Sequence, residues 1–82
     1  MSHVHHELHE EFPNDGDVLH ALKLSDAHFQ KLSDKYHDTN REIHRIEANV
    51  EAASDFRLED LKKERLHLLD EISHIVSRSR AG

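Results

Sequence analysis

The stretch FQKLSDKYHDTNREIHRI, residues 29–46, decides the fold of this chain. Its apolar residues recur at alternating steps of three and four, which is the spacing of one packed face on an α-helix. The stretch LEDLKKERLHLLDEISHI, residues 58–75, repeats this spacing. Two matched faces predict two helices that pack together as an antiparallel, coiled-coil-like hairpin. The apolar seam residues that we expect between them are Phe29, Leu32, Tyr36, Ile43, Ile46, Leu58, Leu61, Leu68, Ile72 and Ile75.

The two rows also predict the register of the hairpin. Facing residues of an antiparallel pair have residue numbers with a constant sum, and the successive members of the two rows obey this rule. The chain must then reverse near Ala52, and the first row can be extended as far as Val50. The polar members of the rows, Thr39 and Arg65, face each other. We expect Arg65 to lie along the seam, reach solvent and fix the register.

Two breaks divide the chain. Residues 13–16 are rich in turn formers, and residues 50–55 contain the other plausible loop. Suitable helix N-caps are Asp15 or Asp17, the pair Ser25 and Asp26, and Ser54 or Asp55. We therefore predict an all-α fold. It has a His-rich, partly flexible segment over residues 1–16, a hairpin domain over 17–78 with helices at about 17–24, 26–49 and 55–78, and a frayed tail over 79–82.

A second apolar row lies on the last predicted helix, about 100° around its axis from the seam. Either the short helix over residues 17–24 folds back over this row, or a second hairpin packs there to form a bundle. Because two helices of this length bury little apolar surface, we expect a dimer or higher oligomer. The interaction stripe that we predict consists of Leu66, Leu69, Val76, Leu8 and Phe12.

The composition narrows the classes of function. With 82 residues, of which 35% are hydrophobic, the chain has room for one domain and a small core, so a buried active-site cleft is not expected. The absence of Cys excludes disulfides, thiolate nucleophiles and Cys-based zinc sites. A net charge of -6 without a basic face argues against nucleic acid as a partner. No apolar run is long enough for a signal peptide or a membrane span, so we expect no membrane partner and a cytoplasmic location.

Ten His residues are the most unusual feature of the composition, and several of them crowd the N-terminus. If that segment is helical, His5 and His9 share one face, and such imidazole pairs can hold zinc, nickel or copper. The candidate metal ligands are His5, His6 and His9. The alternative is a weakly chelating tail, since no Cys and no fixed geometry complete a site.

Several short motifs resemble a known family. They are His9-Glu10-Glu11-Phe12-Pro13, Asp26-Ala27-His28-Phe29, Arg45-Ile46-Glu47 and Leu58-Glu59-Asp60-Leu61-Lys62-Lys63-Glu64-Arg65-Leu66. With these motifs the chain resembles the YdcH-like family of small bacterial proteins over most of residues 9–75. The resemblance implies a bacterial, cytosolic helical hairpin with coiled-coil-like association. The function of that family is not established, and it supplies no catalytic residues to transfer.

These features predict a non-enzymatic helical interaction module that associates with itself and with another bacterial protein. We expect no catalytic residue and no cofactor, because the sequence contains neither a nucleophile motif nor a Gly-rich phosphate loop. Carboxylate pairs occur on the helix surfaces, but no predicted pocket holds them. The alternative function is that of a histidine-rich protein that binds divalent metal ions.

Overall fold

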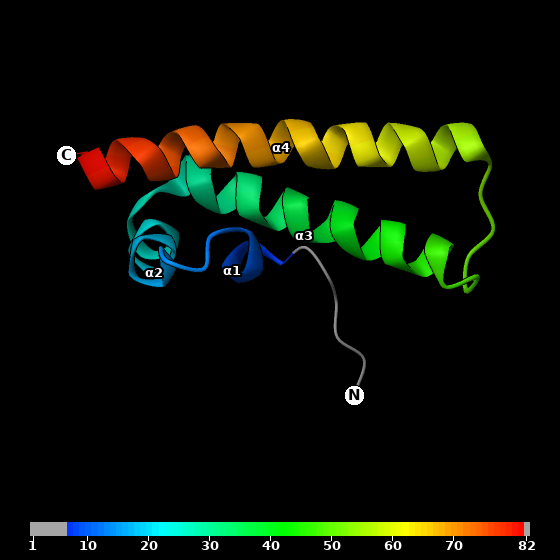
Figure 1. Cartoon of the computed structure of the whole chain (residues 1–82), viewed down its shortest axis with the longest axis horizontal. Helices are drawn as coiled ribbons and strands as arrows, with labels where there is room; N and C mark the ends of the chain where they lie inside the picture. Colours follow the sequence, from blue (N-terminus) through cyan, green and yellow to red (C-terminus); the bar gives the residue numbers. More distant parts are fainter. Residues whose placement is uncertain (1–6, 82) are drawn as a thin grey trace.

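Two long antiparallel helices form the predicted hairpin. They are α3 (Ala27–Glu47) and α4 (Asp55–Ala81), and they pack side by side in a computed structural model that describes residues 7–81 (Figure 1). Two shorter helices, α1 (Leu8–Glu11) and α2 (Gly16–Ser25), precede them. Residues 7–81 contain no strand, which confirms the all-α prediction.

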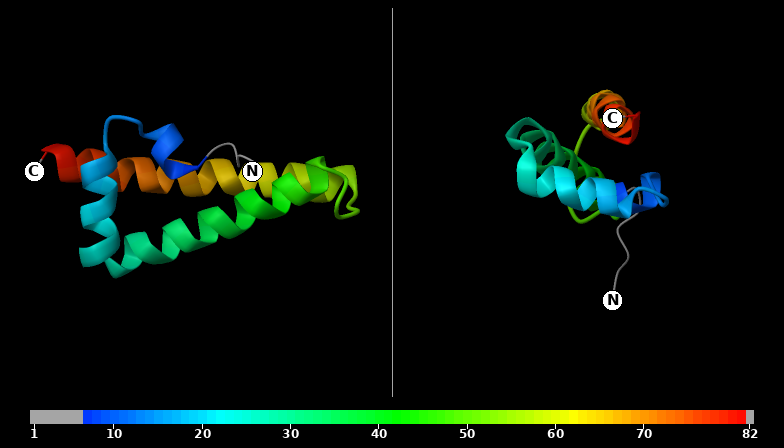
Figure 2. Two further views of the ribbon diagram at one scale, coloured as in Figure 1. Left: turned by 90° about the horizontal axis from the view of Figure 1, so that it is seen from below. Right: turned by 90° about the vertical axis from the view of Figure 1, so that its left-hand side faces the viewer.

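The short helices close the open end of the hairpin. Figure 2 shows α2 lying crosswise at the end where α3 begins and α4 finishes, and α2 packs against both of them. Leu19 and Leu22 are the buried residues of α2. Asp15 is the N-cap residue of α2, but its side chain makes no capping hydrogen bond. Its Oδ1 lies 3.5 Å from Nε of Arg80 on α4. This ion pair joins the start of α2 to the end of α4.

Two side-chain caps begin the hairpin helices where the sequence predicts them. Oδ1 of Asp26 accepts a hydrogen bond from the backbone N–H of Phe29 at 3.0 Å, at the start of α3. The Ser54 hydroxyl oxygen accepts one from the backbone N–H of Arg57 at 3.1 Å, at the start of α4. Each cap satisfies a donor that the first helical turn leaves without an intrahelical partner.

The ends of the hairpin helices differ from the prediction. Asn49 adopts a left-handed backbone conformation with φ of 61°, and the next amide, that of Val50, donates to the carbonyl of Arg45 at 2.9 Å. This closure ends α3 at Glu47, as left-handed residues often do at helix C-termini. The extension of the seam to Val50 is therefore wrong. At the other end of the hairpin, α4 continues to Ala81, through much of the segment predicted to fray.

The seam is buried in two clusters. The larger cluster lies at the end of the hairpin that α2 covers, away from the turn. It contains Phe29, Leu32, Tyr36, Leu68, Ile72 and Ile75, with Leu8, Leu19, Leu22 and Val76. The smaller cluster lies toward the hairpin tip and contains Ile43, Ile46 and Leu61, with Leu58 packed against it. Because residues predicted to face each other fall in the same cluster, this grouping agrees with the predicted register.

A polar layer separates the two clusters. Nη1 of Arg65 donates a hydrogen bond to Oδ1 of Asn40 at 2.9 Å, and Asn40 is fully buried. The predicted register places Thr39 opposite Arg65, and Thr39 is also buried. The guanidinium of Arg65 instead binds Asn40, the residue that follows Thr39 in the sequence. An amide oxygen is a good acceptor for this cation, and the aliphatic stem of Arg65 covers the seam on its way to solvent.

Most residues of the predicted interaction stripe are not exposed, so this prediction has to be corrected. Val76 is fully buried and Leu8 nearly so, both within one chain. Leu69 and Phe12 are partly buried and pack against the same cluster. Within one chain the core thus covers Val76 and part of Leu69, which agrees with the intramolecular alternative for this part of the row. Of the predicted interaction stripe, Leu66 is the member that stays largely exposed, at 60%.

Candidate functional site

A short N-terminal segment, residues 7–12, lies against the hairpin and is here called the strap. It contains one helical turn, in which the backbone N–H of Phe12 donates to the carbonyl of Leu8 at 2.9 Å. The backbone N–H of Glu7 donates to Oε1 of Glu10 at 3.4 Å. A single turn is not stable by itself in water, so packing of Leu8 and Phe12 on the core must hold the strap in place.

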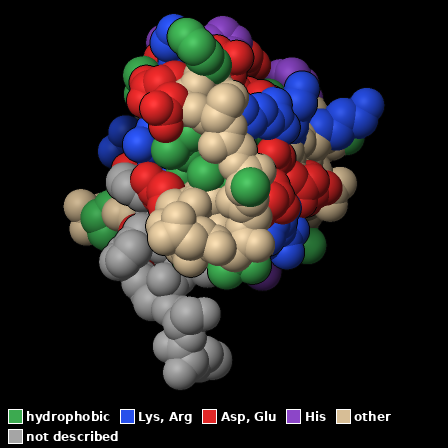
Figure 3. Space-filling model, turned by 90° about the vertical axis from the view of Figure 1, so that its right-hand side faces the viewer, with side chains coloured by type: hydrophobic (Ala, Val, Ile, Leu, Met, Phe, Trp, Pro, Cys, Tyr) green, Lys and Arg blue, Asp and Glu red, His purple; other side chains and the backbone are tan. Residues whose placement is uncertain are grey.

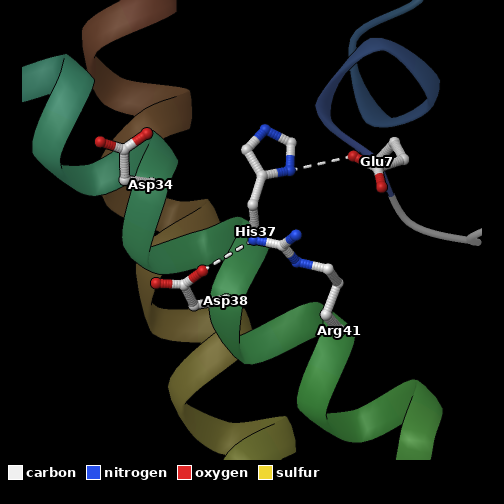
Figure 4. A pocket seen from close by; sticks show the side chains of 5 residues that line it. All are labelled: Glu7, Asp34, His37, Asp38 and Arg41. Atoms are coloured by element: carbon white, nitrogen blue, oxygen red, sulfur yellow. Dashed lines mark hydrogen bonds and ion pairs between the residues drawn. The ribbon is translucent and has the colours of Figure 1, made fainter.

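The strap is tied to α3 by a contact between side chains. Nδ1 of His37 lies 3.0 Å from Oε2 of Glu7, and both side chains are about a quarter exposed (Figure 4). The two residues line a shallow hollow of about 440 Å³ together with Asp34, Asp38 and Arg41. Arg41 turns instead to Asp38, with Nη2 at 2.9 Å from Oδ1. We call the contact between Glu7 and His37 the latch, because it joins the strap to α3.

Tyr36 is buried close to the carboxylates of the strap. Its ring is fully inaccessible to solvent and lies edge-on to the ring of His37, with centroids 6.2 Å apart. Burial, together with the smaller effect of the nearby Glu11 carboxylate, raises the pKa of the Tyr36 hydroxyl to about 12, against the opposing effect of Arg65. Tyr36 therefore keeps its proton over the whole physiological pH range.

The exposed part of the apolar row borders the strap. Leu66 and Leu69 line a hollow of about 240 Å³ between the strap and α4, and the remaining lining residues are Glu11, Tyr36, Lys62 and Arg65. The strap side of this hollow carries an acidic group and the α4 side carries basic groups. The hollow therefore combines apolar walls with charges of opposite sign.

The hairpin tip is a second exposed apolar surface. Val50 is 76% exposed and Phe56 is 85% exposed, on either side of the turn. Figure 3 looks onto this end of the molecule and shows apolar side chains interspersed with acidic and basic ones. Three ion pairs lie behind the tip, namely Arg57 with Glu42 at 2.7 Å, Lys62 with Glu47 at 3.4 Å and Arg45 with Glu51 at 3.4 Å.

Sequence reasoning missed both the latch and the tip. The tip left a signal, because Phe56 is a large apolar residue outside both rows of the hairpin. The latch left none, since Glu7 and His37 are far apart in the sequence and belong to no motif. Both features depend on where the strap and the turn lie in the folded chain.

The predicted metal ligands are placed only in part. His9 is exposed on α1 and borders a hollow that His20 and His37 also line. His5 and His6 lie outside the described residues. Among residues 7–81, no group of three or more His, Asp or Glu side chains is arranged to hold a metal ion. Metal binding by the His-rich start stays a prediction.

Fold and surfaces together define the class as a small all-α protein built on one antiparallel helical hairpin. The family model described as "Protein of unknown function (DUF465)" matches residues 29–76, which span the hairpin from α3 into α4. The chain belongs to this family, which confirms the predicted resemblance to small bacterial hairpin proteins. Neither a curated protein nor a solved structure matches the chain. In the described part of the chain, no helix is both long and apolar enough to span a bilayer.

Proposed function

We propose that this protein is a non-enzymatic helical interaction module, which associates with itself and also binds another protein. The observation that carries the proposal is Leu66, a large apolar side chain that is 60% exposed and lines a hollow together with Leu69. A single exposed leucine is ordinary, but one that continues a covered apolar row marks where that row can be extended by a partner. An amphipathic helix of a partner can place its apolar face against such a surface.

Self-association is tested by changing Leu66 to Glu. Light scattering of the wild-type protein should show a molar mass above that of the monomer at about 100 micromolar, falling on dilution. Leu66→Glu should shift the mass toward the monomer, because it removes an apolar side chain from the interface and a carboxylate must lose its water when it is buried there. Helix content should be retained in circular dichroism, since Leu66 is not part of the folded core.

The matched control is Ser77→Glu, which adds the same charge at an exposed position on the same helix. Its molar mass should equal that of the wild type. A wild-type protein that stays monomeric at every concentration would overturn self-association.

Binding of another protein is assigned to the tip. Val50 and Phe56 lie on either side of the turn and are largely exposed, so an apolar pocket in a partner could hold them. Glu51 and Arg57, which follow them in the sequence, pair within the chain with Arg45 and Glu42. In affinity purification from the native host, the wild-type bait should retain a partner that the bait with Val50→Ser and Phe56→Ser loses. Equal recovery by both baits would exclude the tip as the binding surface.

A further inference from the structure

The hairpin contains a groove that already holds a short peptide segment, namely the strap. We call it the strap groove and define it by five of the residues that line hollows together with strap residues: Leu19, Phe29, Tyr36, His37 and Leu69. Leu8 is 5% exposed in this place, and Phe12 packs against the same cluster. The groove thus accepts an amphipathic turn with two apolar residues four positions apart.

Charge complements shape in the strap groove. The strap carries the acidic residues Glu7, Glu10 and Glu11. On the hairpin, Nδ1 of His37 lies 3.0 Å from Oε2 of Glu7. The cationic side chains of Lys62 and Arg65 line one hollow together with Glu11. Asp34 and Asp38 also line the hollow at Glu7, so the charges are complementary mainly at the Glu11 end of the strap. There the groove accepts an amphipathic segment that carries an acidic residue.

Several features make the strap easy to release. It has only one helical turn, and the Glu7–His37 contact that ties it to α3 is partly exposed, so water weakens its contribution. Three separate hollows border the strap along its length. The segment that joins it to α2 runs through the exposed residues Pro13 and Asn14 before it reaches Asp15, which is buried and paired with Arg80. Residues 13–14 are therefore the hinge about which the strap can move.

We propose that the strap is exchanged between two copies of this chain, so that residues 7–12 of each copy occupy the strap groove of the other. This inference rests on the proposed self-association and names its contact. Because a second copy carries an identical strap, the packing and the Glu7–His37 contact that the strap makes within its own chain form equally well between two chains. In the exchanged pair, the exposed Leu66 of each chain lies beside the strap of the other copy, because Leu66 and Glu11 line the same hollow.

Cross-linking of introduced thiols tests the exchange, because the chain contains no Cys of its own. Two single variants, Glu7→Cys and His37→Cys, are mixed and treated with a short bismaleimide. A bond between Cys at position 7 and Cys at position 37 can then form only between chains, and peptide mass mapping identifies it. We expect this product to exceed by several-fold that of Glu7→Cys mixed with Lys31→Cys, a control at an exposed position elsewhere on α3.

Two further measurements keep the result clear. The double variant Glu7→Cys and His37→Cys, at high dilution, should give the bond within one chain, which shows that the reagent spans the latch. Adding Leu8→Asp to the Glu7→Cys chain should abolish the bond between chains while helix content persists. If the mixed variants give no more product than the Lys31→Cys control, exchange is wrong. Light scattering of the wild-type protein then decides whether the chain self-associates at all. A dimer means that it self-associates through a contact other than the strap, and a monomer overturns self-association as well.

Discussion

Changing Leu68 or Ile43 to alanine is expected to lower the free energy of unfolding by about 2 to 4 kcal/mol each. Leu68 belongs to the larger cluster and is 4% exposed, whereas Ile43 belongs to the smaller cluster and is fully buried. Each substitution removes packed methyl groups from the seam and leaves a cavity that rigid neighbouring helices cannot close. Urea unfolding followed by circular dichroism measures the loss, and the slope of the transition should not change.

The control for both substitutions is Lys63→Ala, at an exposed position on α4. It should change the stability by no more than about 0.5 kcal/mol. If Leu68→Ala and Ile43→Ala also stay within that limit, α3 and α4 do not pack through this seam.

Alkaline pH is expected to destabilise the protein through Tyr36. The pKa of its hydroxyl rises from 10.0 to about 12 in the folded chain, mainly because of burial. Since the folded pKa lies above the unfolded one, this contribution to stability is complete below pH 10 and is lost as the pH rises toward 12. The loss should amount to roughly 2 to 3 kcal/mol, because each unit of pKa corresponds to about 1.4 kcal/mol.

Tyr36 can be followed directly, because the chain has one Tyr and no Trp. The near-ultraviolet absorbance of the phenolate should report a midpoint near pH 12 in the wild type. In Tyr36→Phe the part of the alkaline destabilisation due to this group should disappear. Leu8→Asp, which releases the strap, should move the midpoint back toward 10.0, the ordinary value. A wild-type midpoint at the ordinary value would show that Tyr36 is accessible to water.

The hairpin could be predicted because its contacts repeat along the sequence. Residues such as Ile43 and Leu61 recur at helical spacing on both helices, so a single register satisfies the whole seam. The start of α4 at Ser54 followed from local chemistry in the same way. These features require no knowledge of how distant segments fold back.

The strap could not be predicted, because it has no repeat and no helical period of its own. Leu8 was expected on an interaction surface, and its burial depends on the direction in which the chain turns at residues 13–16. The contact between Glu7 and His37 depends on the same turn. The predicted interaction stripe consists of apolar residues, but the sequence could not show which of them are buried within their own chain and which stay exposed.

The polar layer at Asn40 and Arg65 divides the hairpin into two parts of unequal size. The part near the tip closes over a short loop, which carries a small entropy cost, so its contacts are quick to form. It also has few buried side chains, and a region with few buried contacts opens at a lower free energy than the global unfolding. Amide protons around Ile46 should therefore exchange with solvent faster than those around Ile72, although the same two helices carry both.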